Sequence, residues 1–175
     1  MEVCVLGAGS LGSVIGGTLA LAGHEVTLVT RNRAHVSAVR SDGLHLVDDR
    51  DRVRVELAAT TTLAELPRPD LVVVLVKSFD TTGAIERARH LIGPDTVVLT
   101  LQNGVGCEEL SGDVVGLEHV IAGRTFVGGS MIAPGVVEYG VVGRRTTLGE
   151  LDGSLSPRLQ RIGEAFTDAG FPVDL

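Results

Sequence analysis

The segment that most constrains the fold lies at residues 7–12, where the chain reads Gly-Ala-Gly-Ser-Leu-Gly. An apolar run, Val3–Leu6, comes directly before it, and apolar residues at helical spacing follow from Ser10 to Ala22. A second apolar run, Val26–Val29, completes a strand–helix–strand unit. A GxGxxG turn placed between a strand and a helix in such a unit is typical of dinucleotide-binding domains.

A physical reason explains why each of these three positions is glycine. Gly7 permits the tight turn, Gly9 lets the backbone approach a pyrophosphate, and Gly12 lets the helix pack closely on the strand. The start of the helix then offers unpaired N–H groups and a positive dipole end to the phosphates. The alternative is a glycine-rich turn without a ligand. We predict the turn to be a cofactor-binding site made of Gly7, Ala8, Gly9, Ser10, Leu11 and Gly12.

Strands and helices alternate along the rest of the chain, which predicts a Rossmann-type, doubly wound α/β sheet with mostly parallel strands. Its 175 residues suit one domain, residues 1–175. We expect antiparallel strands at a sheet edge within residues 120–139. The other predicted strands cover 44–47, 53–57 (with a charged turn at 48–52 between them), 71–76, 97–101 and the chain from 170, and the predicted helices cover 32–40, 81–91, the chain from 107, and 157–169.

Composition excludes several classes of protein. The net charge of −7 and the pI of about 5.2 argue against nucleic acid or an anionic membrane as a partner. Residues 3–23 carry no charge, but their glycines favour a strand, a turn and a buried helix over a membrane span. The only cysteines, Cys4 and Cys107, form no CxxC pair, which predicts a reducing cytoplasm. The five histidines lack metal-ligand spacing, so no metal is expected.

The end of the second predicted strand indicates which dinucleotide the turn would hold. Domains that bind NAD or FAD usually carry Asp or Glu there, bonded to the ribose 2′-hydroxyl. This chain has Arg31 and Arg33 at that point and no acid. A guanidinium matches a phosphate in charge and in bidentate geometry, so we predict NADP(H) as the cofactor and Arg31 as a phosphate ligand. The alternative for both arginines is a solvated position at a helix start, and it is stronger for Arg33.

Two polar residues follow predicted buried strands. Lys77 comes after the run 71–76, and Asn103 comes after 97–101. In open α/β sheets, ligands bind outside the carboxyl ends of the strands. A lysine there can hold a ribose, phosphate or carboxylate, and an asparagine can donate and accept at once. Taken singly, the lysine could simply extend to solvent and the Asn-Gly pair could simply form a turn. Together, beside the GxGxxG turn, they favour ligand contact.

These motifs together resemble the ketopantoate reductase (2-dehydropantoate 2-reductase) family over the whole chain. The resemblance rests on GAGSLG at 7–12, Thr-Arg at 30–31, VVVLVKSFDT at 72–81, LQNGVG at 101–106, PGVVEYG at 134–140 and LGELDG at 148–153.

That resemblance implies roles for single residues. The glycine turn and Arg31 would bind NADPH, and Lys77 and Asn103 would lie by the cofactor ribose and nicotinamide, with Asn103 also near the substrate. Gly129, to within one residue of alignment, would touch the cofactor through its backbone. The implied reaction is hydride transfer to the keto carbon of ketopantoate, which gives pantoate for pantothenate synthesis.

The same resemblance implies a second, all-helical domain that carries a general-acid lysine. The chain ends at Leu175, where that domain would begin, and its only lysine, Lys77, matches a cofactor position. We therefore expect no catalytic residue within these 175 residues, and cofactor binding without turnover. The expected partner is a small keto acid, and a homodimer stays open. The alternatives are a non-catalytic dinucleotide-binding sensor or regulatory module, or a related 2-keto or 3-hydroxy acid dehydrogenase with another substrate.

Overall fold

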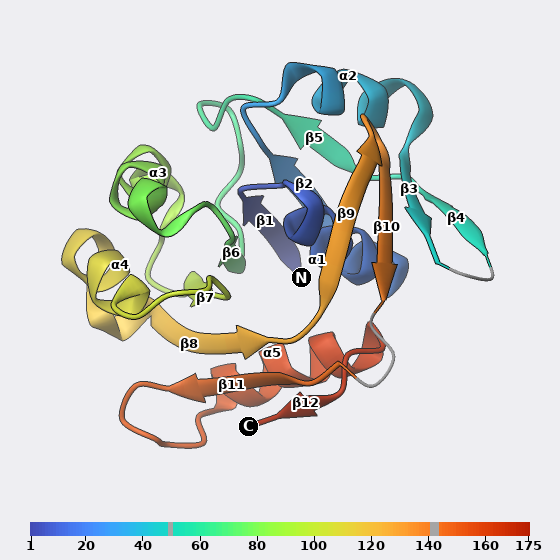
Figure 1. Cartoon of the computed structure of the whole chain (residues 1–175). Coiled ribbons are helices and arrows are strands. Elements are labelled where there is room, and N and C mark those ends of the chain that lie inside the picture. The colour runs from blue at the N-terminus through green and yellow to red at the C-terminus, as the bar shows by residue number, and fades with distance from the viewer. Residues whose placement is uncertain (49–50, 141–143) are drawn as a thin grey trace.

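A computed structural model describes residues 1–48, 51–140 and 144–175, and within these ranges it shows two β-sheets and five α-helices (Figure 1). The larger sheet has the strand order β12-β11-β8-β7-β6-β1-β2-β5. Its members are β1 (Glu2–Leu6), β2 (Glu25–Val29), β5 (Ala58–Thr60), β6 (Leu71–Val74), β7 (Val97–Thr100), β8 (Val120–Thr125), β11 (Thr146–Glu150) and β12 (Val173–Asp174).

The strand directions confirm the predicted fold class. From β5 through β2, β1, β6 and β7 to β8, every neighbouring pair is parallel. Strand β11 then runs antiparallel to β8, and β12 runs parallel to β11. All residues of β6 and β7 are buried, as expected for parallel strands that are covered on both faces.

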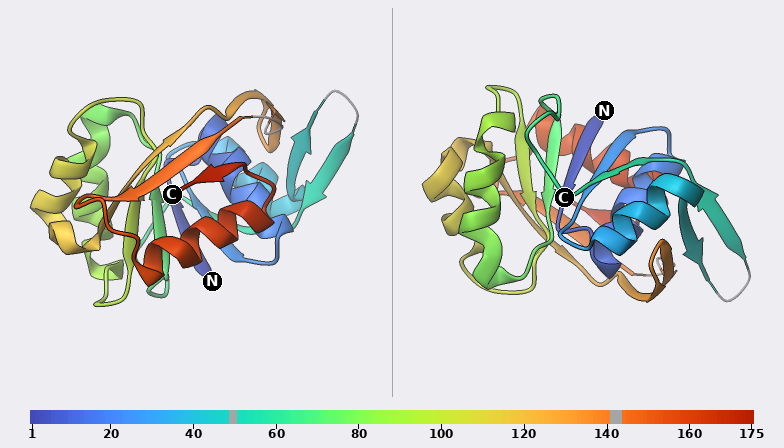
Figure 2. Two further views of the ribbon diagram at one scale, coloured as in Figure 1. Left: turned by 90° about the horizontal axis from the view of Figure 1, so that it is seen from below. Right: turned by 90° about the horizontal axis from the view of Figure 1, so that it is seen from above.

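Helices cover both faces of this sheet (Figure 2). The buried apolar side chains form two separate clusters, one on each face. On one face lie α1 (Ser10–Leu21), α2 (Arg33–Asp42) and α5 (Pro157–Asp168). The other face carries α3 (Thr81–Ala88) and α4 (Cys107–Val115). Short 3-10 turns, η1 (Ser78–Asp80), η2 (Arg89–Leu91) and η3 (Leu117–His119), complete the connections.

Two helix starts follow directly from the local sequence. The Ser156 side chain accepts a hydrogen bond from the Leu159 amide, and Pro157 occupies the first turn, so α5 begins where predicted. Asn32 caps α2 in the same way by accepting from the His35 amide. Among the residues that the structure describes, no helix is both long and apolar enough to cross a bilayer.

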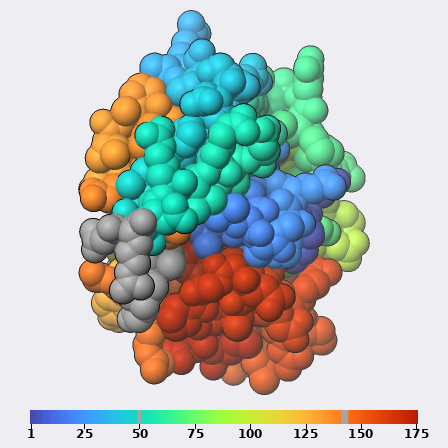
Figure 3. Space-filling model, turned by 90° about the vertical axis from the view of Figure 1, so that its right-hand side faces the viewer, coloured from blue at the N-terminus to red at the C-terminus, as the bar shows by residue number. Residues whose placement is uncertain are grey.

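Residues 120–139 form antiparallel pairings as predicted, but the prediction that these strands lie together at one sheet edge was wrong. β8 pairs in parallel with β7 inside the large sheet and antiparallel with β11, which lies next to the edge strand β12. β9 (Gly128–Ala133) and β10 (Val136–Gly140) leave that sheet and join β3 (Leu44–Val47) and β4 (Arg52–Val55) in a small sheet of order β4-β3-β10-β9. Figure 3 shows the β3–β4 hairpin (teal) against the blue N-terminal segment.

The small sheet forms because β3 and β10, far apart in sequence, pair in parallel, with Leu46 opposite Val137. Both side chains are completely buried and belong to the cluster that covers α1. Tertiary burial of the apolar side chains therefore decides the pairing. The predicted charged turn at 48–52 falls partly outside the described residues, which omit 49–50.

Candidate functional site

The glycine turn lies where the strand order of the large sheet reverses. Strand β1 sits between β2 and β6, and Leu6 is paired with Val29 on one side and with Val74 on the other. The residues that follow these three strand ends therefore meet at one edge. In open α/β sheets this edge, outside the carboxyl ends at the reversal, is the ordinary place for a ligand.

The three glycines of the GxGxxG motif differ in what surrounds them. Gly7 has a φ of +96°, and a Cβ atom there would lie 2.5 Å from the backbone nitrogen of Val76. A Cβ at Gly12 would lie 2.5 Å from the Gly7 carbonyl oxygen. At Gly9 a Cβ would meet nothing within 4 Å. The fold itself thus requires Gly7 and Gly12, whereas Gly9 leaves the open backbone that a pyrophosphate needs.

Backbone hydrogen bonds tie the turn to the end of β2. The amides of Gly7 and Ala8 both donate to the Val29 carbonyl at 3.0 Å, and the Gly9 amide donates to the Gly7 carbonyl at 2.7 Å. Ala8 is completely buried, so its side chain packs inside the protein and supports the turn.

The N-terminus of α1 supplies the remaining donors. Its first helical bond runs from the Ser13 amide to the Gly9 carbonyl, 2.9 Å away. The Ser10 hydroxyl accepts from the Met131 amide at 3.0 Å, which ties strand β9 to this turn and leaves the hydroxyl proton free to donate. The amides that precede the first helical bond, and that can bind an anion, are those of Ser10, Leu11 and Gly12.

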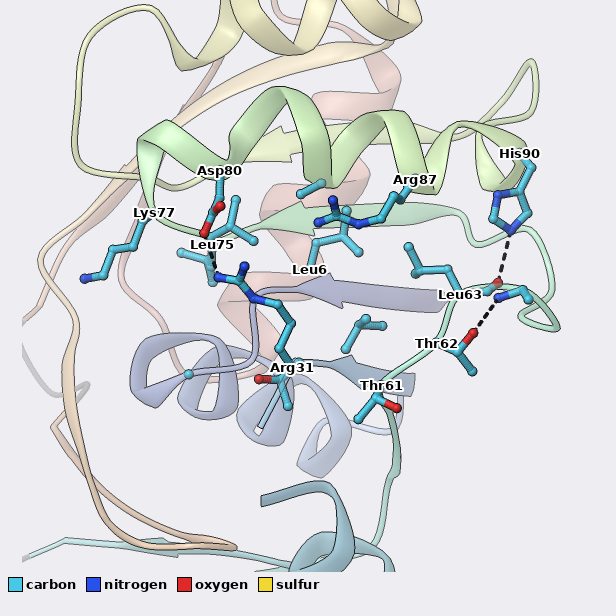
Figure 4. Close-up of a pocket in the computed structure, with 17 residues that line it drawn as sticks. Leu6, Arg31, Thr61, Thr62, Leu63, Leu75, Lys77, Asp80, Arg87 and His90 are labelled. Carbon is cyan, nitrogen blue, oxygen red and sulfur yellow. Dashed lines mark hydrogen bonds and ion pairs between the residues drawn. The ribbon is translucent and has the colours of Figure 1, made fainter. Parts of the chain in front are cut away.

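A cavity of about 530 Å³ extends from this turn toward α3. Figure 4 shows Arg31 and Asp80 meeting above the turn, with Arg87 reaching in from α3. Apolar and small side chains form much of the wall, which suits a planar nucleoside between polar ends. The wall is made by Leu6, Gly7, Gly9, Val29, Thr30, Arg31, Thr61, Thr62, Leu63, Ala64, Leu75, Val76, Lys77, Asp80, Ala84, Arg87 and His90.

Arg31 lines this cavity, as its predicted role requires, but it is paired. Its Nη2 atom lies 2.7 Å from Oδ2 of Asp80, which stands at the start of α3. The Arg31 side chain is 83% exposed and that of Asp80 26% exposed. Arg33, the weaker candidate, is exposed at the start of α2 and does not line the cavity.

Lys77 and Asn103 lie on neighbouring turns of the same sheet edge, since Val74 is paired with Thr100. The two turns are joined by Gln102, whose side-chain amide donates to the Val76 carbonyl at 2.7 Å. Lys77 and Asn103 are both exposed, and neither side chain makes a hydrogen bond to the described part of the chain. They are therefore free to bind a ligand. Lys77 lines the main cavity, whereas Asn103 lines a neighbouring hollow beside Arg124.

Gly129 lies on β9 against helix α1. A Cβ atom there would come within 2.7 Å of Cγ2 of Val14 and 3.2 Å of the Glu138 carbonyl oxygen. Close packing of the small sheet on α1 thus already requires a glycine at this position.

The buried cysteines and the buried histidine of this region are held in their neutral forms. Burial raises the pKa of the Cys4 thiol to about 12, and burial together with Glu108 raises the pKa of Cys107. Burial lowers the pKa of His35. In the described ranges, no group of three or more His, Cys, Asp or Glu side chains gathers as metal ligands would. These groups are suited to packing rather than to nucleophilic chemistry.

Sequence reasoning missed three parts of the site: Asp80, Gln102 and the segment 61–64 after β5. The pairing of Asp80 with Arg31 joins positions 49 residues apart, and no local pattern marks it. Gln102 directly precedes Asn103, so its place after a buried strand was a usable signal.

The fold and the crevice define a Rossmann-type dinucleotide-binding domain. Residues 3–153 match the family described as ketopantoate reductase PanE/ApbA, and the chain belongs to this family of pyridine-nucleotide-dependent oxidoreductases. The 2-dehydropantoate 2-reductase of Pyrococcus horikoshii is 35% identical over 100% of this chain and 56% of that protein. The chain thus spans about half the length of this relative.

Solved structures agree with this assignment. The PanE/ApbA family ketopantoate reductase from Ralstonia eutropha JMP134 superposes with a TM-score of 0.88 and 31% identity, over 99% of this chain and 56% of that one. A complex of D-mandelate dehydrogenase with NADH superposes with a TM-score of 0.86 and 25% identity, over 99% of this chain and 55% of that one.

Proposed function

We propose that this chain is the cofactor-binding half of an NADPH-dependent 2-keto acid reductase that converts ketopantoate to pantoate in pantothenate synthesis. The observation that carries the proposal is the cavity that joins the open backbone at Gly9 to the guanidinium of Arg31. The P. horikoshii relative, named 2-dehydropantoate 2-reductase, supports the choice of substrate.

The residues present fit a dinucleotide. The amides at the start of α1 and the Ser10 hydroxyl would hold the pyrophosphate, and Arg31 would hold the 2′-phosphate. Lys77 and Asn103 would contact the ribose and carboxamide of the nicotinamide half, with Asn103 also reaching the substrate. When bound, the reduced nicotinamide supplies the hydride. The role of this chain is to bind and orient it, and the contact of Gly129 with the cofactor belongs to the same proposal.

Binding tests the proposal directly. NADPH fluorescence titration should show saturable binding, and Arg31→Ala should weaken it about tenfold or more, because a hydrogen bond to a charged group contributes roughly 1.5–3 kcal/mol. Arg33→Ala is the matched control, since it removes the same charge two residues away without touching the cavity. Equal effects of the two substitutions would contradict the assignment of Arg31.

Lys77→Ala and Asn103→Ala should also weaken NADPH binding. Both side chains are exposed and unbonded within the described ranges, so the midpoint of thermal unfolding should stay nearly unchanged. A large loss of stability with unaltered binding would instead assign both residues to the fold.

Turnover should separate from binding. Hydride addition to a ketone builds negative charge on oxygen, and a general acid typically contributes ~10²–10⁴-fold to the rate. Lys77 is the only lysine and is assigned to the cofactor. We therefore expect the 175-residue chain to bind NADPH without oxidising it when ketopantoate is added. Rapid loss of NADPH absorbance would contradict this and make Lys77 the first candidate for the acid.

A further inference from the structure

Asp80 lies between η1 and α3, and its carboxylate is bonded across the cavity rather than to its own helix. It occupies the N-cap position of α3, yet its side chain makes no capping hydrogen bond there. Its backbone is in the αR region, as the last residue of η1, whereas a residue that caps a helix through its side chain is typically in the extended region. Here the carboxylate turns toward the cavity and pairs with Arg31 at 2.7 Å.

The ion pair contributes little to folding stability. The Arg31 side chain is 83% exposed, and ion pairs between exposed groups typically contribute only ~0–1 kcal/mol. Folding stability therefore gives little reason for this pair, and both of its partners line the cavity.

We propose that Asp80 is the specificity determinant of the ribose end of this cavity. It supplies, from the turn η1 before α3, the acid that NAD-binding domains usually carry at the end of their second strand. The strand β2 itself ends at Val29, with no acid after it through Arg33. This inference rests on the proposed function, because it assumes that the cavity takes the adenosine half of a pyridine dinucleotide.

The Arg31–Asp80 pair offers binding groups to both NADH and NADPH. With Arg31 bound to Oδ2, the carboxylate keeps acceptor positions for the ribose hydroxyls of NADH. The 2′-phosphate of NADPH must instead compete with Asp80 for the Arg31 guanidinium, and it is then repelled by the negatively charged Asp80 carboxylate. Asp80 thus favours NADH and weakens the preference for NADPH that Arg31 alone would give. The NADH complex of the D-mandelate dehydrogenase relative is in keeping with such a fold accepting NADH.

Calorimetric titration of the chain with NADPH and with NADH tests this inference. The isosteric Asp80→Asn substitution should tighten NADPH about three- to tenfold and weaken NADH by a similar factor, so the ratio of the two dissociation constants should move by roughly tenfold or more. Glu86→Gln is the matched control. It removes one negative charge from an exposed position of α3 outside the cavity wall, and it should leave the ratio within about twofold.

A second pair of variants shows whether the effect passes through Arg31. In an Arg31→Ala background, Asp80→Asn should tighten NADPH much less than it does in the parent, because the guanidinium that it releases is gone. Failure of Asp80→Asn to change the ratio would overturn the inference while the proposed function stood. Binding of neither nucleotide by the folded parent chain, with folding checked by circular dichroism, would overturn both.

Discussion

The two sheets pack against different sides of helix α1 and make different contacts with it. Toward the large sheet the contact is apolar and close: a Cβ atom at Gly16 would lie 2.5 Å from Cδ2 of Leu28 in β2. Toward the small sheet, Gly17 allows an equally close approach, since a Cβ atom there would lie 2.8 Å from Cδ2 of Leu44 in β3. Two consecutive glycines thus let α1 fit between two sheets.

Among the described residues, it is the small-sheet side that adds polar side-chain contacts to this packing. The Gly135 amide, between β9 and β10, donates to Nδ1 of His35 at 3.0 Å. The neutral ring must then carry its proton on Nε2, which lies 3.0 Å from the Ser13 hydroxyl on α1. The Ser10–Met131 bond joins the same partners at the glycine turn.

The difference teaches how the glycine turn is held in place. The large sheet positions it through apolar burial and backbone hydrogen bonds, which do not depend on pH. The small sheet adds a few polar contacts, one of which involves His35, an ionisable side chain whose pKa is lowered by burial. We therefore expect the two sheets to differ in their response to mutation and to acid.

The largest expected effect is on the large-sheet side. Gly7→Val should destabilise the protein by roughly 3–5 kcal/mol, because a branched side chain would meet the backbone of Val76 and would have to adopt a positive φ. Urea denaturation measures the change. Gly9→Ala, where a Cβ meets nothing within 4 Å, is the control within the same motif and should cost less than about 1 kcal/mol. Similar losses at the two positions would contradict the packing described.

A smaller effect should follow from removal of the histidine that joins the small sheet to α1. His35→Ala leaves the Ser13 hydroxyl and the Gly135 amide unpaired in a buried place, at a cost of roughly 2–4 kcal/mol. Amide hydrogen exchange should show the loss chiefly in β9 and β10, with β1 and β6 of the same sample as the internal reference. Uniform loss of protection across both sheets would show that they do not open separately.

Ser10→Ala should have a still smaller effect, about 1 kcal/mol, because it removes one hydrogen bond to the Met131 amide. Exchange of the Met131 amide should accelerate more than that of its neighbours. Unchanged protection at Met131 would mean that another acceptor replaces the hydroxyl.

The smallest expected effect is a pH dependence. Burial lowers the pKa of His35 in the folded protein, so the unfolded chain takes up a proton first as the pH falls. The contribution of His35 to stability is therefore complete above about pH 6.5 and declines below it, by about 1 kcal/mol or less at pH 6. Exchange in β9 and β10, corrected for intrinsic rates, should show this loss.

Two other titratable groups have shifted pKa values. The pKa of His24 is also lowered, by burial and by the N-terminal amine, so His24→Asn serves as the control and should leave the response of the small sheet intact. Asp42 titrates below this range, because a hydrogen bond from His45 lowers its pKa. No response of β9 and β10 to pH in the parent protein would contradict the role given to His35.

The elements that the sequence predicted well are those with local causes. Helix α5 begins at its Ser156–Pro157 signal, and α1 begins within the glycine motif. The long apolar runs became β6 and β7, although β6 ends at Val74, two residues early. Strand β5 was missed, because a three-residue strand carries too little pattern to be recognised.

By itself the sequence determined the strand–turn–helix unit, the need for glycine at 12, and the arginine at the end of β2, because each depends on neighbours within a few residues. Only the tertiary structure decided that β3 pairs with β10 and that Asp80 meets Arg31. Those contacts join distant residues whose approach is set by the packing of whole elements, since burial of apolar surface has no direction of its own and leaves no local signature.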